Sequence, residues 1–488
     1  MNFSPPGSSS PFIEAVWPIL QSALREIVSW ALEALTAATG AILLNVEKQL
    51  HVKVAAQICD PLLGCLLRVA VNSPELAQGA TELVSLREHS RLQDSKQKVQ
   101  VRLLGGTLQS VVVQYFLIRA PRGKGRPTKK RGPNGNGFYP QLELLGIHGR
   151  VSPALASLAA SQLARSPVEE ALSVLNDQGI RLDSKTLTRI GQGVAQRALD
   201  FRAGLVDQIR SGERGRLCKG KRFAIAVDGG RIRTRDYKGR RRRSTRRRRF
   251  KGEWREPKVF VIYELDPAGR RDRKGLRIYE GTMGPADDCF ELLAAYLCYI
   301  GAHEADEIVV VADGASWVWN RIENLLKVTG IDPAKVTEVV DFYHVAERFH
   351  DVAKTVSGWT EEQRQKWVKA RLHQVRGGQL AEAMAACEEL KKGRRAKAVA
   401  KLSKYFRNNE ARMDYQNCRR RRLPMGSGAV ESGIRRIINL RLKGNGIFWG
   451  IQNAEGLIHL RGHLLAGRWP QLVQSAILPK EHWANRAA

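Results

Sequence analysis

Three acidic residues have the types and spacing of a metal site. Asp228 and Asp313 each close a short apolar run rich in β-branched residues, at residues 223–228 and 307–313. Each is followed at once by glycine, which is typical of a buried strand that stops at a turn. Glu431 follows a stretch that contains proline and glycine, so we expect it about one turn into a new helix. The pattern predicts two strand-end carboxylates and one helix-borne carboxylate.

These positions predict a binding site for Mg²⁺. In open α/β sheets, ligands bind outside the carboxyl ends of the strands, so Asp228 and Asp313 would lie at the ligand-binding edge. A carboxylate from Glu431 would complete an oxygen-donor site of the kind that Mg²⁺ prefers. Taken alone, Glu431 has a second interpretation, because an acidic residue in the first turn of a helix also interacts favourably with the helix macrodipole.

Four segments place these acids in a wider pattern. They read AVDGG at residues 226–230, VADGASW at 311–317, DFYH at 341–344 and PMGSGAVE at 424–431. Each is a weak signal by itself, whereas four in this order are specific. Over roughly residues 98–469, the chain resembles the DDE transposases of bacterial insertion sequences, most closely the ISKra-like group, which is related to the Mutator-type transposases.

The resemblance implies a fold and an activity. It implies an RNase H-like core with two Mg²⁺ ions, which Mn²⁺ could replace: Asp228 would bridge both ions, Asp313 would bind one and Glu431 the other. The expected enzyme is a Mg-dependent transposase that cuts the ends of its DNA element and joins the freed 3′-hydroxyl to target DNA. Two alternatives stay open. One is a nuclease with the same core that cuts without joining, and the other is a DNA-binding descendant of a transposase without catalysis.

Asp341 and His344 also have two interpretations. Together they resemble the signature of Asp or Cys, two residues, then His that Mutator-like transposases carry between the second Asp and the Glu. His344 could orient the scissile phosphate or a metal-bound water. Alternatively, Asp341 makes hydrogen bonds at the end of its strand and orders the site without touching the metal. Asp341 is also a rival candidate for the second metal-binding position.

The charge of the chain indicates a nucleic-acid partner. The chain holds 80 Lys plus Arg against 48 Asp plus Glu, which gives a net charge of +32. Such a field attracts polyanions without reading their sequence. A run of basic residues is usually only a solvated face. We nevertheless expect the most basic run to contact DNA phosphates, because arginines crowded in one loop repel one another unless a polyanion neutralises them. Its arginine blocks are Arg240, Arg241, Arg242 and Arg243, then Arg246, Arg247, Arg248 and Arg249.

Two further segments are expected to contact DNA. Residues 153–201 show the pattern of three helices, and Lys185 and Arg189 share an early turn of the last one. This arrangement is similar to the recognition helix of a helix-turn-helix protein, although three helices also pack together without any DNA contact. Arg435 and Arg436 follow Glu431 on a basic face of its helix, where a phosphate backbone is the natural partner.

The order of elements predicts an α/β fold. We expect an RNase H-like mixed sheet flanked by helices, with an α-helical insertion and a mostly α-helical N-terminal region. The expected parts are an N-terminal helical region at 1–97, a β-hairpin with a basic loop at 98–150, a helix-turn-helix-like region at 151–220, the first part of the catalytic core at 221–344, a helical insertion at 345–422, the core helix that carries Glu431 at 423–470, and a tail at 471–488.

Cysteine usage and hydropathy bear on the compartment. The seven cysteines are scattered and none has zinc-ligand spacing. In related transposases, the region that corresponds to residues 122–136 resembles a small zinc ribbon with paired cysteines. This chain has no cysteine there, so we expect no zinc. Charged residues interrupt the apolar stretch 11–46, so we expect no membrane partner and a location in the bacterial cytoplasm, on the nucleoid when bound to DNA.

Holding two element ends together would require a homo-oligomer, at least a dimer on DNA, and the helical N-terminal region is the candidate surface.

Overall fold

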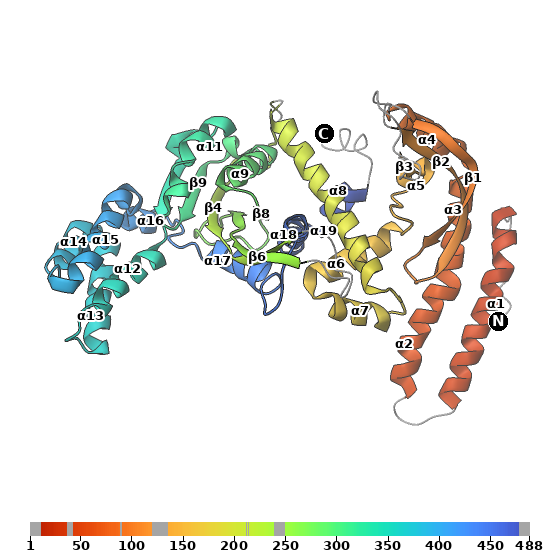
Figure 1. Ribbon diagram of the computed structural model, residues 1–488, viewed down its shortest axis with the longest axis horizontal. Helices are drawn as coiled ribbons and strands as arrows, with labels where there is room; N and C mark the ends of the chain where they lie inside the picture. The colour runs from red at the N-terminus through yellow and green to blue at the C-terminus, as the bar shows by residue number, and fades with distance from the viewer. Residues whose placement is uncertain are drawn as a thin grey trace. The chain divides into compact units, whose positions relative to one another are not determined.

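The computed structural model describes residues 11–36, 42–87, 90–119, 135–210, 212, 214–238 and 249–477. Over these residues the chain is a mixed α/β protein with a helical N-terminal region. It divides into two compact units, one made of residues 1–201 and 470–488 and the other of residues 202–469. Figure 1 labels the helices and strands of both units.

The first unit starts with helices and continues into a small sheet. The helices are α1 (Pro11–Thr36), α2 (Ile42–Val54), α3 (Asp60–Ala70) and α4 (Pro74–Ser85), and a π-helical turn (Ala55–Cys59) joins α2 to α3. The antiparallel sheet has the order β1-β2-β3 and consists of β1 (Ser90–Arg102), β2 (Leu108–Arg119) and β3 (Gly135–Phe138). The short helix α5 (Pro140–Leu144) follows it.

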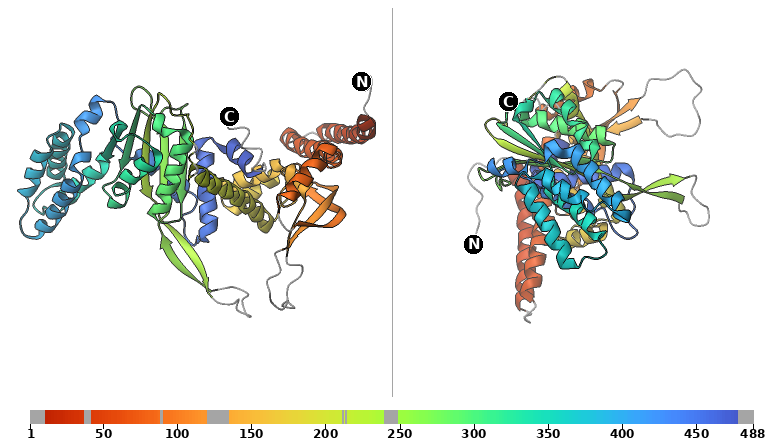
Figure 2. Two further views of the ribbon diagram at one scale, coloured as in Figure 1. Left: turned by 90° about the horizontal axis from the view of Figure 1, so that it is seen from above. Right: turned by 90° about the vertical axis from the view of Figure 1, so that its left-hand side faces the viewer.

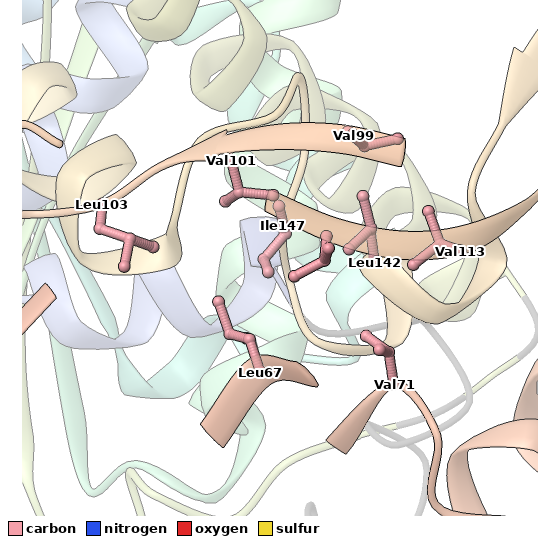
Figure 3. Close-up of a cluster of buried hydrophobic side chains, with 9 residues drawn as sticks. Leu67, Val71, Val99, Val101, Leu103, Val113, Leu142 and Ile147 are labelled. Carbon is pink, nitrogen blue, oxygen red and sulfur yellow. The ribbon is translucent and has the colours of Figure 1, made fainter. Parts of the chain in front are cut away.

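A cluster of branched aliphatic side chains forms the core between α3 and this sheet. Leu67 and Val71 point from the α3 segment toward Val99, Val101 and Val113 of the β1–β2 hairpin (Figure 3). Inward-facing residues alternate along both strands, which is the pattern of a sheet with one buried face. The hairpin therefore packs on α3 through a single apolar face.

One helical stretch, Leu43–Ala70, is long and apolar enough to cross a membrane by length and composition alone. A single stretch of this kind is weak evidence of a span, because core helices pass the same test. Buried Asp60 lies inside it and accepts hydrogen bonds from Gly105 N at 2.9 Å and Thr107 N at 3.0 Å, in the turn between β1 and β2. These contacts tie the stretch to the sheet of its own unit.

Three helices follow α5 in the chain: α6 (Pro153–Arg165), α7 (Val168–Asp177) and α8 (Ser184–Arg210). The division between the two units falls within α8, after Phe201. The side chain of Asp183 starts α8, because its Oδ1 accepts hydrogen bonds from Lys185 N at 3.0 Å and Thr186 N at 2.9 Å. The last helix, α19 (Trp469–Ile477), also spans the boundary between the units.

The start of β1 differs from the expectation. The helical region was expected to reach residue 97, but its last helix ends at Ser85 and β1 begins at Ser90. Residues 90–97 are polar except for the exposed Leu92, and the pairing with β2 is irregular between Leu92 and Gln97. A strand that buries neither face has no apolar alternation, so hydrophobic periodicity does not reveal it.

A five-stranded sheet organises the second unit. Its strands are β4 (Arg222–Gly229), β7 (Lys258–Glu264), β8 (Arg277–Thr282), β9 (Glu307–Ala312) and β10 (Val336–Val340), in the order β10-β9-β4-β7-β8. The pairs β4–β9 and β9–β10 are parallel, whereas β4–β7 and β7–β8 are antiparallel. The helices between these strands are α9 (Ala286–Ile300), α10 (Ser316–Trp319) and α11 (Ile322–Thr329).

Helices cover both faces of this sheet. On one face, the Phe260 ring of β7 meets Tyr296 of α9, with ring centroids 5.9 Å apart. Val261 points to the opposite face, where a Cβ added at Gly433 of α17 (Gly428–Ile434) would lie 3.3 Å from its side chain. Burial on both faces explains why β4, β7 and β9 are continuous apolar runs rather than alternating ones.

A helical segment lies between β10 and α17 in sequence. It comprises α12 (Phe342–Lys354), α13 (Glu361–Arg376), α14 (Leu380–Glu388), α15 (Ala396–Asn409) and α16 (Tyr415–Arg420), and Figure 1 shows these helices grouped at the left of the view, to the left of β9. Aromatic rings form its core: Phe349 lies 5.1 Å from Phe406 and 6.1 Å from Trp367, measured between centroids. After α17 come a π-helical turn (Arg435–Asn439) and α18 (Ile451–Ala466), which packs on β8.

A two-stranded hairpin extends from the sheet between β4 and β7. It consists of β5 (Ile232–Lys238) and β6 (Arg249–Arg255), which pair with each other as a separate antiparallel sheet. Both views in Figure 2 show this ribbon projecting away from the rest of its unit. Arg249 is exposed on β6, whereas the other arginines of the two blocks, at 240–243 and 246–248, lie outside the described residues.

Candidate active site

The parallel strands bring three aspartates to one edge of the sheet. Asp228 is the penultimate residue of β4, and Asp313 and Asp341 directly follow β9 and β10. Ala226 pairs with Val311, and Ala312 with Val340, so the three strands end at the same level. The expected convergence of Asp228 and Asp313 at a carboxyl edge therefore has a direct structural basis, and Asp341 joins them.

The loop before α17 brings Glu431 to this edge. Phe342 N, at the start of α12, donates a hydrogen bond to Met425 O at 2.9 Å, and this contact anchors the loop. Ser427 N then donates to Asp341 Oδ2 at 2.7 Å. Ser427 Oγ donates its single proton to the same oxygen and lies 3.2 Å from Glu431 Oε1. Ser427 therefore connects the strand-end carboxylate to the helix-borne one, while Glu431 itself stays exposed.

Asp341 is fully buried, and protein donors occupy both of its oxygens. Oδ1 accepts from Tyr343 N at 2.6 Å and His344 N at 3.3 Å, which caps α12, and Oδ2 accepts from Ser427. Burial favours the neutral acid, but hydrogen bonds from His344 and Ser427 outweigh it and hold the pKa of Asp341 below its ordinary value. These contacts favour the interpretation in which Asp341 orders the site.

His344 places a positive charge among the carboxylates. Its Nδ1 lies 3.5 Å from Asp341 Oδ2, the distance of an ion pair rather than of a short hydrogen bond. The neighbouring Asp341 carboxylate raises the pKa of His344 to about 9 despite its partial burial. At neutral pH the ring is therefore a cation that can donate to a phosphate oxygen. Ligand atoms of Asp341, His344 and Glu431 lie within 4.8 Å of one another, so a neutral His344 would also permit a metal ion there.

Asp228 is affected by its burial and by the charges of Asp313, His344 and Glu431. Burial, followed by the charges of Asp313 and Glu431, raises its pKa to about 6, and the backbone N–H of Gly229 and the charge of His344 limit the rise. Gly229 N lies 2.6 Å from Asp228 Oδ1. A partly buried carboxylate whose pKa is raised beside other carboxylates is stabilised by a bound cation. The carboxylates of Asp228, Asp313 and Glu431 are donors of the kind that Mg²⁺ prefers, whereas among the described residues at this edge the ligand atoms found within 4.8 Å of one another are those of Asp341, His344 and Glu431.

A tyrosine from the helical segment reaches the same place. Asp313 Oδ1 accepts from Ala315 N at 3.0 Å, and the intervening Gly314 lies against the Tyr405 ring so closely that a Cβ would collide with Cε2. The Tyr405 hydroxyl is buried, has no hydrogen-bond partner within the part of the chain that the structure describes, and burial raises its pKa. Its proton is thus available to a ligand at the acidic edge. No pattern in the sequence distinguishes this tyrosine from others in the segment.

The remaining expected contact residues lie on surfaces. Lys185 and Arg189 are exposed on the first turns of α8 in the first unit, and Arg435 is exposed after α17 in the second. Arg436 is half-buried, and its carbonyl oxygen accepts from Arg461 Nε at 3.0 Å. Exposure leaves the first three free to contact phosphate, whereas the backbone of Arg436 also supports the packing of α18.

A second group of possible ligands lies at a different place in the same unit. Ligand atoms of Glu280, His459 and His463 also lie within 4.8 Å of one another. However, protein donors already surround Glu280: Gly281 N lies 3.0 Å and Arg202 Nη1 3.2 Å from Oε1, while Tyr296 OH lies 2.7 Å and His459 Nδ1 2.6 Å from Oε2. This cluster is a buried ion network that joins β8 to α18. The sequence patterns did not indicate it.

The charges of this network agree with a structural role. Burial disfavours the Glu280 carboxylate, but His459 and Arg202 more than compensate and lower its pKa well below the ordinary value. Burial, followed by the neighbouring His459, lowers the pKa of His463 to about 3, so this ring is neutral at physiological pH.

Comparison of the chain with protein-family models, curated proteins and solved structures found no match.

Proposed function

We propose that the chain is a Mg²⁺-dependent DDE transposase with an RNase H-like core. The observation that carries the proposal is the convergence of Asp228, Asp313 and Glu431 at one edge of the sheet, where burial and, less strongly, the charges of Asp313 and Glu431 raise the pKa of Asp228 to about 6. The sheet order β10-β9-β4-β7-β8, with three antiparallel strands followed by two parallel ones, supports the same fold.

The chemistry follows from the residues at the edge. Asp228, Asp313 and Glu431 would hold the metal, which when bound supplies Lewis-acid activation of a water or a DNA 3′-hydroxyl and neutralises the phosphate. The His344 imidazolium is placed to donate to a phosphate oxygen, and Asp341 keeps that ring oriented and charged. Ser427 fixes Glu431 relative to Asp341. The cytoplasmic location inferred from the sequence is part of this proposal.

Two surfaces support the proposed partners. The net charge of +32 supports binding of the DNA backbone at element ends and at target DNA. On α1 and α2, several large apolar side chains are exposed, which supports the helical N-terminal region as the surface of a homodimer. They include Leu24, Val28, Leu32, Leu35, Leu43 and Leu44.

The experiment that tests the proposal follows DNA products. The full chain is incubated with labelled DNA from the flanks of its own coding sequence and with a supercoiled target, in Mg²⁺ and in EDTA, beside Glu431→Gln. We expect cut ends and joined products only in Mg²⁺ and only with Glu431 present. Nicks without joining would replace the proposal by the nuclease alternative. DNA binding without either product would replace it by the inactive DNA-binding descendant.

A further inference from the structure

The β5–β6 hairpin has two chemically different faces. In its register, Arg233 lies opposite Trp254, and Tyr237 opposite Phe250, so these side chains share one face of the ribbon. Arg235, two residues from both Arg233 and Tyr237, lies on the same face. We name it the aromatic face, and its members are Arg233, Arg235, Tyr237, Phe250 and Trp254. The opposite face, the mixed-charge face, carries Asp236, Lys238, Arg249, Lys251, Glu253 and Arg255.

The rings of the aromatic face are exposed but held in place. Tyr237, Phe250 and Trp254 are 48%, 44% and 46% exposed. Phe250 packs at 5.1 Å on the ring of Phe448. Gly252, between Phe250 and Trp254, allows this approach, because a Cβ there would lie only 2.9 Å from Phe448 Cε1. The rings are therefore a built surface rather than loose side chains.

Arginines alternate with these rings and keep their charge. The Arg233 guanidinium lies 4.9 Å from the centroid of Trp254, and that of Arg235 lies 5.3 Å from the centroid of Tyr237. Arg231, just before β5, lies 5.2 Å from Trp254 as well. A guanidinium over a ring retains its full positive charge. Within the described ranges, the structure shows no carboxylate paired with these three arginines.

The mixed-charge face is different. There, Glu253 accepts from Lys251 at 2.5 Å and from Arg255 at 3.1 Å, so these two cations share one carboxylate of the ribbon itself, and no exposed ring lies among them. Only the aromatic face combines exposed rings with arginines that lie over those rings. Cations alone are sufficient for the backbone of a duplex, whose bases are stacked inside, whereas exposed rings can stack on bases whose faces are free.

We propose that the aromatic face binds unpaired nucleotides of single-stranded DNA, with rings stacking on bases and arginines contacting phosphates. The hairpin begins four residues after Asp228, so a bound strand would enter beside the acidic edge. The role of this strand as the unpaired end of cut DNA rests on the proposed function, whereas the binding itself does not require catalysis.

The test measures the binding of the full chain, in EDTA, to a labelled 15-nucleotide single strand and to the matching duplex by fluorescence anisotropy. Trp254→Ala should weaken single-strand binding roughly 10-fold, since stacking on one ring contributes that order of affinity, and should leave duplex binding within about twofold. Trp254→Phe should restore most of the loss. Thermal unfolding of each variant confirms that the ribbon remains folded.

Arg233→Ala and Lys251→Ala are the matched pair of controls. Arg233→Ala removes one positive charge from the aromatic face, and Lys251→Ala removes one from the mixed-charge face of the same ribbon. Arg233→Ala should weaken single-strand binding several-fold more than Lys251→Ala does. Equal effects from both faces, or equal loss of duplex and single-strand binding in Trp254→Ala, would overturn the inference. Because binding is measured in EDTA, it does not depend on the proposed metal chemistry. Failure of the proposed function would therefore appear as missing DNA products with ring-dependent binding intact.

Discussion

Asp228→Asn is expected to abolish DNA cleavage and, in the absence of metal, to raise the stability of the protein. The Asp228 carboxylate is buried beside Asp313 and Glu431, and this environment raises its pKa to about 6. Asparagine has no charge, so the substitution removes both the cost of burying the carboxylate and its repulsion by Asp313 and Glu431. It also removes the ligand proposed to contact both metal ions. The same substitution should therefore damage function and improve the metal-free fold, as expected for a residue retained for chemistry.

The sign of the pH dependence follows from the direction of the shift. The folded protein holds the Asp228 proton up to about pH 6, whereas the unfolded chain loses it near the ordinary value of 3.8. Stability from this group is therefore full below pH 3.8 and is lost as the pH rises through 6. At pH 7.5 and without metal, we expect Asp228→Asn to be more stable by about 1–2 kcal/mol, a figure reduced for partial solvent screening.

Thermal unfolding with and without Mg²⁺ measures this effect. Added Mg²⁺ should raise the melting temperature of the unaltered chain and leave that of Asp228→Asn unchanged, because a ligand stabilises only the state that binds it. Asp236→Asn is the control, since this aspartate is exposed on the hairpin in the same unit. An Asp228→Asn protein that is less stable in EDTA and still responds to Mg²⁺ would contradict the assignment.

Glu280→Gln is expected to destabilise the second unit by about 3–5 kcal/mol, the usual effect of removing one partner from a buried ion network. The substitution keeps the shape of the side chain but leaves Arg202 and His459 without the carboxylate that they share. Because the pKa of Glu280 is lowered in the folded state, its contribution is present above its ordinary pKa and is lost as the pH falls through the folded value.

Urea unfolding at pH 7 checks this prediction, with Glu361→Gln as the control. Glu361 forms an exposed pair with Arg364 at 3.5 Å, and pairs of this kind contribute at most about 1 kcal/mol. DNA binding by the folded Glu280→Gln protein should be unaltered, because no member of the network is among the residues proposed to contact DNA. Equal unfolding midpoints for the two variants would show that the network has no structural role.

The parts of the site that the sequence predicts are those with local signals. Asp228 and Asp313 close apolar runs and precede glycine, so strand ends could be inferred before their register was known. The start of the Glu431 helix follows from proline and glycine in the same way, and the helix begins at Gly428. The α/β class and the helical N-terminal region follow from the order of such runs.

The parts that could not be predicted depend on long-range contacts. Glu280 and His459 are 179 positions apart, and only the packing of α18 on β8 makes them partners. Tyr405 lies beside Gly314 because the helical segment folds back onto the acidic edge. The aromatic face of the hairpin needs the pairing of Arg233 with Trp254, which the basic composition of the run conceals. Periodicity describes one element at a time, so it gives no information about such pairs.

The central claim is that Asp228, Asp313 and Glu431 form one metal site, and the most direct measurement is titration of Mn²⁺ into the full chain, with free Mn²⁺ followed by electron paramagnetic resonance. It needs no knowledge of the element ends. We expect Mn²⁺ binding that Mg²⁺ displaces, that weakens in Asp228→Asn, Asp313→Asn and Glu431→Gln, and that is unchanged in Glu280→Gln. Binding that survives all three substitutions at the sheet edge, or that is lost only in Glu280→Gln, would contradict the account.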